Sequence, residues 1–188
     1  MTPPGTTPQL FQDSMALAPN SGERVRLQRP GMRIGAVVSR FHEDLTGAML
    51  RSAEAELRAS GMDEDGLHVV WAPGAFELPL IARRLARRKD IDAVMCFGLV
   101  LTGETNHDHW VSMGATQGIQ LAMMETGKPI LFGVLTCQTL EQATSRALSV
   151  AEGGKEDKGR EVACAAVASL LALDECDKRP NEKPRMGF

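Results

Sequence analysis

The 188-residue chain lacks several features that would place it in a specialised class of protein. It has no apolar run long enough to cross a bilayer, and no basic segment followed by an apolar one near its start, so neither a transmembrane helix nor a secretory signal is expected. Its formal net charge is −3, and basic residues cluster only at positions 83–89. We therefore expect no binding to nucleic acid or to a membrane.

Cysteine is also scarce and scattered. The four cysteines are Cys96, Cys137, Cys164 and Cys176, and no two of them form a Cys-x-x-Cys pair. This spacing disfavours both a disulfide framework and a thiolate zinc site. The apolar surroundings of Cys96 and the alanine-rich surroundings of Cys164 are typical of buried thiols that form no disulfide. A protein of the reducing cytoplasm fits this pattern.

What the chain does have is the composition of an ordinary globular domain. Hydrophobic residues make up 43% and charged residues 24%, which suits one domain with a substantial core. Residues 1–30 are rich in Pro, Thr, Ser, Gln and Asn without sustained periodicity, so we expect a flexible N-terminal extension. Residues 178–188 predict a polar C-terminal tail. The ordered domain is therefore expected to span residues 31–177.

Strand-like and helix-like segments alternate through this domain. Short apolar runs predict buried strands at residues 32–40, 67–73, 91–101 and 129–136. Helical periodicity predicts helices at residues 43–61, 75–88, 109–127, about 140–151 and 159–173. Pro79 fits its helix only in the first turn, and the glycine-containing link between the last two helices must be kinked.

This alternation predicts an α/β fold, a three-layer α/β/α sandwich around a four-stranded parallel sheet. Right-handed crossovers between parallel strands place helices on both faces of the sheet. Ligands of such sheets bind at the carboxyl ends of the strands. Functional residues should therefore follow the strands directly.

The loops after the first two predicted strands carry candidate ligand-binding residues. Phe41 stands where the chain leaves the first strand, and it could either cover the end of the core or stack on a planar ring. After the second strand, Pro73 and Gly74 force a turn that leads to Glu77 at the start of a helix. Glu77 could simply favour the helix dipole, or it could accept hydrogen bonds from ligand hydroxyls beside free backbone NH groups.

The loop after the third strand reads GETNHDH, from Gly103 to His109. Gly103 lets the backbone approach a ligand, and the helix start that follows could bind a phosphate or merely be capped by Thr105 or Asn106. His107 and His109 point to different sides of a helix but to one side of an extended chain. No further His or Cys cluster completes a metal site, so we expect no metal and favour proton transfer by one histidine.

Five segments occur in a recognisable order along the domain: SRFH, WAPGAFELP, GLVLTGETNHDHWV, LFGVLT and SRAL…EDKG. Together they resemble the lumazine synthase (6,7-dimethyl-8-ribityllumazine synthase) family of riboflavin biosynthesis. The resemblance covers nearly the whole predicted domain and implies a flavodoxin-like sandwich. It also implies a transferase that joins 5-amino-6-(D-ribitylamino)uracil to 3,4-dihydroxy-2-butanone 4-phosphate, with loss of phosphate and water and without a cofactor.

The resemblance also implies roles for individual residues. Phe41 would stack on the pyrimidine ring, and Glu77 would bind the ribityl hydroxyls. His107 would transfer protons, Arg146 would pair with the phosphate, and Lys158 would add positive charge nearby. The other implied substrate-binding residues are Ala75 and Phe76 on the second loop, Val100 and Leu101 in the ring pocket, Gly103, Glu104 and Thr105 around the phosphate, and Phe132, which would close the ring site from a neighbouring subunit.

The chain departs from the family pattern at three places. His42 replaces the common asparagine, Thr102 stands where arginine or lysine is frequent, and residues 108–110 replace an aromatic-acidic-aromatic series. His109 thus occupies the position of an acidic partner to the catalytic histidine, a role that Asp108 could take. The alternative function is therefore a non-catalytic homologue that binds or stores a flavin or lumazine. A synthase that makes riboflavin from two lumazines is disfavoured because the phosphate contacts are retained, and a non-catalytic shell protein is the least favoured alternative.

Self-association is a further implication of the resemblance, because active sites of this family lie between neighbouring subunits. Its members form pentamers, pairs of pentamers or sixty-subunit shells. The stretch between Arg146 and Lys158 is longer than the compact linker that is typical of shell-forming members. We therefore expect a homopentamer or a decamer.

Overall fold

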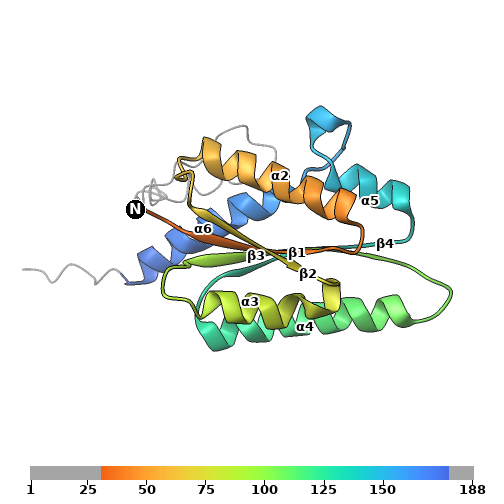
Figure 1. The fold of residues 1–188 in the computed structure, drawn as a ribbon, viewed down its shortest axis with the longest axis horizontal. Coiled ribbons are helices and arrows are strands. Elements are labelled where there is room, and N and C mark those ends of the chain that lie inside the picture. The colour runs from red at the N-terminus through yellow and green to blue at the C-terminus, as the bar shows by residue number, and fades with distance from the viewer. Residues whose placement is uncertain (1–30, 178–188) are drawn as a thin grey trace, which may run out of the picture.

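Four parallel strands form the centre of the molecule in the computed structural model, which describes residues 31–177 (Figure 1). The strands are β1 (Ile34–Ser39), β2 (Leu67–Ala72), β3 (Ala93–Leu101) and β4 (Ile130–Cys137), and their order across the sheet is β2-β1-β3-β4. All four predicted strands are confirmed. The predicted N-terminal extension and C-terminal tail lie outside the described residues.

Helices cover both faces of this sheet, as predicted. The helices are α2 (Glu43–Ala59), α3 (Leu78–Ala86), α4 (His107–Thr126), α5 (Leu140–Ala147) and α6 (Lys158–Asp177), with short 3₁₀ turns η1 (Ala75–Glu77) and η2 (Val150–Glu152). Helices α2, α5 and α6 lie on one face, and α3 and α4 lie on the other (Figure 1). The three-layer sandwich is therefore confirmed. None of the described helices has the length and apolar character needed to cross a membrane.

The strand sequences explain why the sheet carries a core on each face. Side chains alternate along β3, so Met95, Phe97 and Leu99 join the core under α2, α5 and α6, whereas Val94 and Cys96 join the core under α3 and α4. Central strands with both faces covered are apolar almost throughout. Cys96 is buried as predicted, and burial raises the pKa of its thiol. The prediction for Cys164 was wrong, because this residue is only partly buried.

Three of the helices have boundaries that differ from the prediction. The expected helix at 75–88 is divided into η1 and α3, with Pro79 in the first turn of α3, where its missing NH group is harmless. Helix α4 begins at His107, two residues earlier than expected. Helix α5 ends early because Leu148 is extended, and Gly153 then takes a φ of 94° in the predicted kink.

The beginning of α6 is fastened directly to α2. A β-carbon added to Gly159 would lie 2.1 Å from the carbonyl oxygen of Met49, so only glycine permits this approach. Asp157 accepts hydrogen bonds from the Ser52 hydroxyl at 2.6 Å and from the Arg160 NH group at 3.0 Å. The contact fixes the position of Lys158, the first residue of α6.

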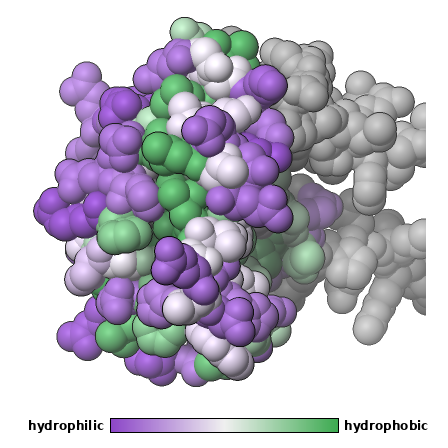
Figure 2. All heavy atoms as spheres, turned by 90° about the vertical axis from the view of Figure 1, so that its right-hand side faces the viewer, coloured by the Kyte–Doolittle hydropathy of each residue, from purple (hydrophilic) through white to green (hydrophobic). Residues whose placement is uncertain are grey.

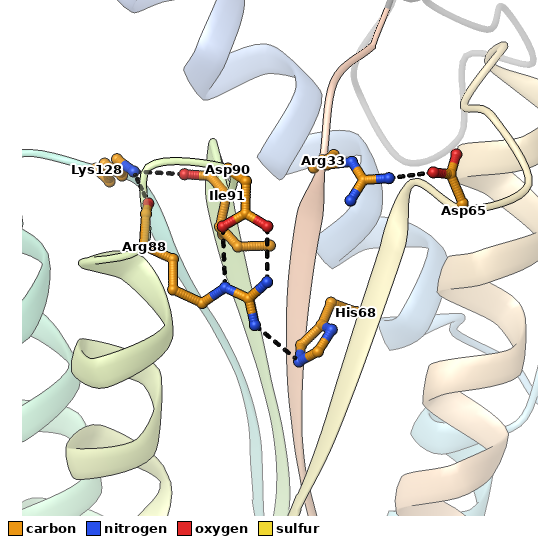
Figure 3. A network of polar contacts seen from close by, with 7 residues as sticks. All are labelled: Arg33, Asp65, His68, Arg88, Asp90, Ile91 and Lys128. Carbon is orange, nitrogen blue, oxygen red and sulfur yellow. Dashed lines mark hydrogen bonds and ion pairs between the residues drawn. The ribbon is translucent and has the colours of Figure 1, made fainter.

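Charged pairs gather at the amino ends of the strands (Figure 3). The guanidinium of Arg88 donates two hydrogen bonds to the Asp90 carboxylate, at 2.7 and 3.0 Å. Lys128 donates to the carbonyl oxygens of Arg88 and Ile91 at 2.7 and 2.5 Å. These contacts tie the end of α3 and the segments before β3 and β4 together.

The Arg88–Asp90 pair allows a prediction about the titration of the Asp90 carboxylate in acid. Hydrogen bonding to Arg88 lowers the pKa of Asp90 from 3.8 to about 2. A lowered pKa means that the pair stabilises the folded state above the unfolded pKa and loses this effect as the pH falls from about 4 toward 2. We expect NMR at a pH of about 3 to find Asp90 still ionised in the wild type and mostly protonated in Arg88→Gln. Equal protonation in both proteins would contradict the assignment.

Candidate active site

The carboxyl ends of all four strands lie at the edge of the sheet that is on the right in Figure 1. The loops that leave this edge are residues 40–42 after β1, 73–77 after β2 and 102–106 after β3, while α5 follows β4 closely. Figure 2 views this side of the molecule and shows a strip of hydrophobic surface between hydrophilic flanks. The edge therefore offers both an apolar surface and polar groups to a ligand.

The turn between β1 and α2 presents Phe41 to solvent. The Phe41 NH group donates to the Ser39 hydroxyl at 3.1 Å, and the buried Thr46 hydroxyl donates to the Ser39 carbonyl oxygen at 2.7 Å. Phe41 is 64% exposed, so its ring does not cover the end of the core. The structure thus removes the core-covering alternative for this residue and leaves a ring that is free to contact a ligand.

The turn between β2 and α3 brings Glu77 back over Gly74. A β-carbon added to Gly74 would lie 3.1 Å from Oε2 of Glu77, which places the carboxylate beside the turn. Ala75 is buried, whereas Phe76 is 59% exposed and its ring lies against α4 at Gly114. Glu77 is the N-cap residue of α3, and its side chain makes no capping hydrogen bond. The Leu78 NH group donates to the Ala75 carbonyl oxygen and Pro79 has no NH group, so the polar group that this turn offers to a ligand is the Glu77 carboxylate.

The loop between β3 and α4 is exposed and open. It leaves the sheet beside β4, because the Thr102 NH group donates to the Cys137 carbonyl oxygen at 2.9 Å. A β-carbon added to Gly103 would meet nothing within 4 Å. Asn106 makes no side-chain cap, and Thr105 accepts only a long hydrogen bond, 3.4 Å, from the His107 NH group. The first turn of α4 is therefore weakly capped, which suits the phosphate-binding alternative better than the capping one.

The two histidines of this loop belong to the first turn of α4. Because His107 and His109 are both helical, their side chains point in different directions, and the extended arrangement that would suit a metal does not occur. Within residues 31–177, no group of three or more His, Cys, Asp or Glu side chains is placed to hold a metal ion. His109 makes an edge-to-face contact with Trp110, with ring centres 5.1 Å apart. His107 is exposed, and no carboxylate of the described chain pairs with it.

The two predicted cations lie on the α5 and α6 side of the sheet. The Arg146 guanidinium donates to the Gln142 carbonyl oxygen at 3.1 Å, and its Nε lies 3.7 Å from Glu156. Burial raises the pKa of the Cys137 thiol, the Arg146 charge acts in the opposite direction, and Glu156 adds to the rise. Arg146 therefore lies close to the carboxyl end of β4. Lys158 forms an ion pair with Glu161 in the same turn, so an anionic ligand would have to compete for both cations.

Phe132 lies apart from the other candidates. It pairs with Cys96 in the middle of the sheet, whereas Cys137 and Leu101 pair at the carboxyl edge. Five residues along a strand correspond to about 16 Å. Phe132 is 43% exposed on the outer strand β4. The single chain thus brings Phe41, residues 75–77, residues 100–107 and Arg146 to one edge, with Lys158 at the neighbouring start of α6, and leaves Phe132 elsewhere.

The structure also identifies residues that the sequence reasoning missed. Ser39 and Thr46 hold the Phe41 turn, and the acidic residues Glu156 and Glu161 hold the two cations. In the sequence each of these looks like an ordinary polar residue of a strand end, helix or loop. A separate hollow of about 310 Å³ is lined by Leu140, Glu141, Thr144, Ser145, Gly153 and Lys155, and none of these is a predicted site residue.

Comparison with known proteins points to one family. The family model described as 6,7-dimethyl-8-ribityllumazine synthase matches residues 31–174 of the chain. The chain is also similar to proteins named 6,7-dimethyl-8-ribityllumazine synthase from two strains of Thermus thermophilus. Each is 42% identical over 149 residues, which cover 79% of this chain and 92% of the relative.

Proposed function

The chain belongs to the 6,7-dimethyl-8-ribityllumazine synthase family, and we propose that the carboxyl edge of its sheet holds the reacting groups. It is an enzyme of riboflavin biosynthesis, a transferase that joins 5-amino-6-(D-ribitylamino)uracil to 3,4-dihydroxy-2-butanone 4-phosphate and releases phosphate and water. The observation that carries the proposed site is the convergence on one edge of the β1, β2 and β3 loops and of the Arg146 side chain, which reaches back along α5 toward the end of β4.

The strand order supports an arrangement of the substrates along this edge. Glu77 follows β2, Phe41 follows β1, Val100 and Leu101 end β3, and Arg146 lies by the end of β4. With the order β2-β1-β3-β4, the ribityl chain would lie at Glu77, the pyrimidine ring at Phe41 and the apolar end of β3, and the phosphate toward β4. The ribityl chain, the pyrimidine ring and the phosphate would thus be arranged along the edge in the spatial order of the strands.

The phosphate would lie between the open start of α4 and Arg146. Backbone NH groups near Gly103, the Thr105 hydroxyl and a guanidinium are donors that suit a phosphate, and Lys158 adds a second positive charge. As phosphate leaves, negative charge grows on it, and fixed donors lower the barrier by stabilising that charge. The pairing of Arg146 with Glu156 is solvent-exposed and long, so displacement by a dianion would cost little.

His107 would transfer the protons. The substrate amine attacks the ketone to give an imine, a step that removes protons from nitrogen and delivers them to the departing water. An imidazole can both give and accept a proton, which suits this transfer. His107 is exposed at the start of α4, directly after the proposed phosphate site. Much of the remaining acceleration would come from holding the two substrates side by side.

We further propose that the working enzyme is a homopentamer or a decamer. Phe41 and Phe76 are exposed in the single chain, and Phe132 lies about 16 Å from the edge where they gather. A neighbouring subunit that presents its own Phe132 would cover the proposed binding site of the pyrimidine ring at Phe41. It would supply the side chain that this chain cannot bring there itself. The kinked link that contains η2 and Gly153 matches the long linker expected of assemblies without a shell.

Proton transfer by His107 can be tested with both substrates and purified protein. We expect lumazine absorbance and free phosphate to rise together, and His107→Ala to lower kcat by about two to four powers of ten. His68→Ala is the matched control, because His68 lies at the amino end of β2 and contacts Arg88. An unchanged kcat in His107→Ala would contradict its role. Wild-type protein that binds lumazine but releases no phosphate would favour the storage alternative.

The oligomeric state can be measured by light scattering. The chain mass is 20.3 kDa, so a pentamer or a decamer should give a particle of roughly 100 or 200 kDa. A particle of roughly one megadalton would instead indicate a sixty-subunit shell and would contradict the proposal.

A further inference from the structure

The residue after Phe41 has an unusual backbone conformation. Within residues 31–177, His42 is the only non-glycine residue with a positive φ, at φ 60° and ψ 48°. The left-handed region is unfavourable for a residue with a β-carbon, and such residues persist only where their surroundings hold them. They cluster at ligand-binding sites. His42 lies next to Phe41, on which the pyrimidine ring is proposed to stack, and its backbone conformation therefore requires an explanation.

The backbone of this turn is held without help from the imidazole. The His42 carbonyl oxygen accepts the NH groups of Leu45 and Thr46, both at 3.0 Å, and the Thr46 hydroxyl at 3.2 Å. On the other side, the Phe41 NH group bonds to Ser39. His42 occupies the N-cap position of α2, but its side chain makes no capping hydrogen bond. Glycine would satisfy the same backbone with less strain, and the imidazole makes no capping bond that would account for a histidine here.

The imidazole instead lies against the ring of Phe41. The two ring centres are 4.7 Å apart and the planes meet at 75°, which is the edge-to-face arrangement that aromatic pairs prefer. Phe41 is 64% exposed, so most of its surface touches no protein. A ring this exposed can turn about its side-chain bonds, and the contact with the imidazole restricts that rotation.

We propose that His42 is a positioning residue that holds the Phe41 ring in the orientation in which it stacks on the pyrimidine. This inference rests on the proposed function. When a ligand binds only one orientation of a side chain, its apparent Kd equals the intrinsic Kd divided by the fraction of protein that has this orientation. His42 raises that fraction without touching the substrate. Its effect should appear in the binding of the pyrimidine substrate and of the lumazine product, and not in the binding of the butanone phosphate.

The test is a double-mutant cycle with His42→Asn and Phe41→Ala. Asparagine tolerates the left-handed backbone and lacks the ring, and His42→Gly serves as a second variant that also removes the backbone strain. Calorimetric titration of each protein with 6,7-dimethyl-8-ribityllumazine gives Kd, steady-state kinetics gives KM for each substrate and kcat, and thermal unfolding gives Tm. The cycle isolates the coupling between the two residues.

We expect both His42 variants to weaken lumazine binding by about threefold to tenfold, the effect of losing one edge-to-face contact. KM for the pyrimidine substrate should rise equally, while kcat and KM for the butanone phosphate stay near their wild-type values, and Tm stays near its wild-type value in His42→Asn. In the Phe41→Ala background, His42→Asn should have no further effect on Kd.

Two results would overturn the inference alone. One is wild-type Kd in both His42 variants of a protein that binds lumazine and forms product. The other is an equal loss from His42→Asn with and without Phe41, which would mean that His42 contacts the ligand itself. Wild-type protein that neither binds lumazine nor forms it would overturn the proposed function and, with it, the inference about His42.

Discussion

Parallel hydrogen bonding between the strands places their carboxyl ends at one edge, and the rest of the molecule depends on this alignment. Leu101 pairs with Cys137, and the Thr102 NH group continues the ladder to the Cys137 carbonyl oxygen. A slip of one residue between β3 and β4 would turn every side chain of one strand to the opposite face. The two buried cores keep the register, because each accepts only one set of side chains from β3.

The two edges of the sheet differ in how their polar groups are satisfied. At the amino edge, charged side chains pair with one another and with backbone carbonyl oxygens, as in the Arg88–Asp90 pair and at Lys128 (Figure 3). At the carboxyl edge, Phe41 and His107 are exposed, and the first turn of α4 is weakly capped. Arg146 and Lys158 are paired with Glu156 and Glu161 on this side, so an anionic ligand would have to displace these carboxylates.

The layer order and the location of the candidate site were predictable from the sequence, since both follow from apolar periodicity and from what comes after each strand. The orientation of individual side chains was not predictable. Phe41 could have covered the core, but in the folded chain its NH group is bonded to Ser39 and its ring is exposed. The left-handed His42 and the Glu156 partner of Arg146 depend on residues brought together by folding. The proposed role of Phe132 would need a second chain, because the single chain places this residue away from the carboxyl edge.

A crystal structure with an analogue of the pyrimidine substrate and inorganic phosphate tests the central claim most directly. The account predicts the heteroaromatic ring stacked on Phe41, its ribityl chain at Glu77, and phosphate between the first turn of α4 and Arg146. Ligand density at another surface, with the carboxyl edge empty in every subunit, would contradict it.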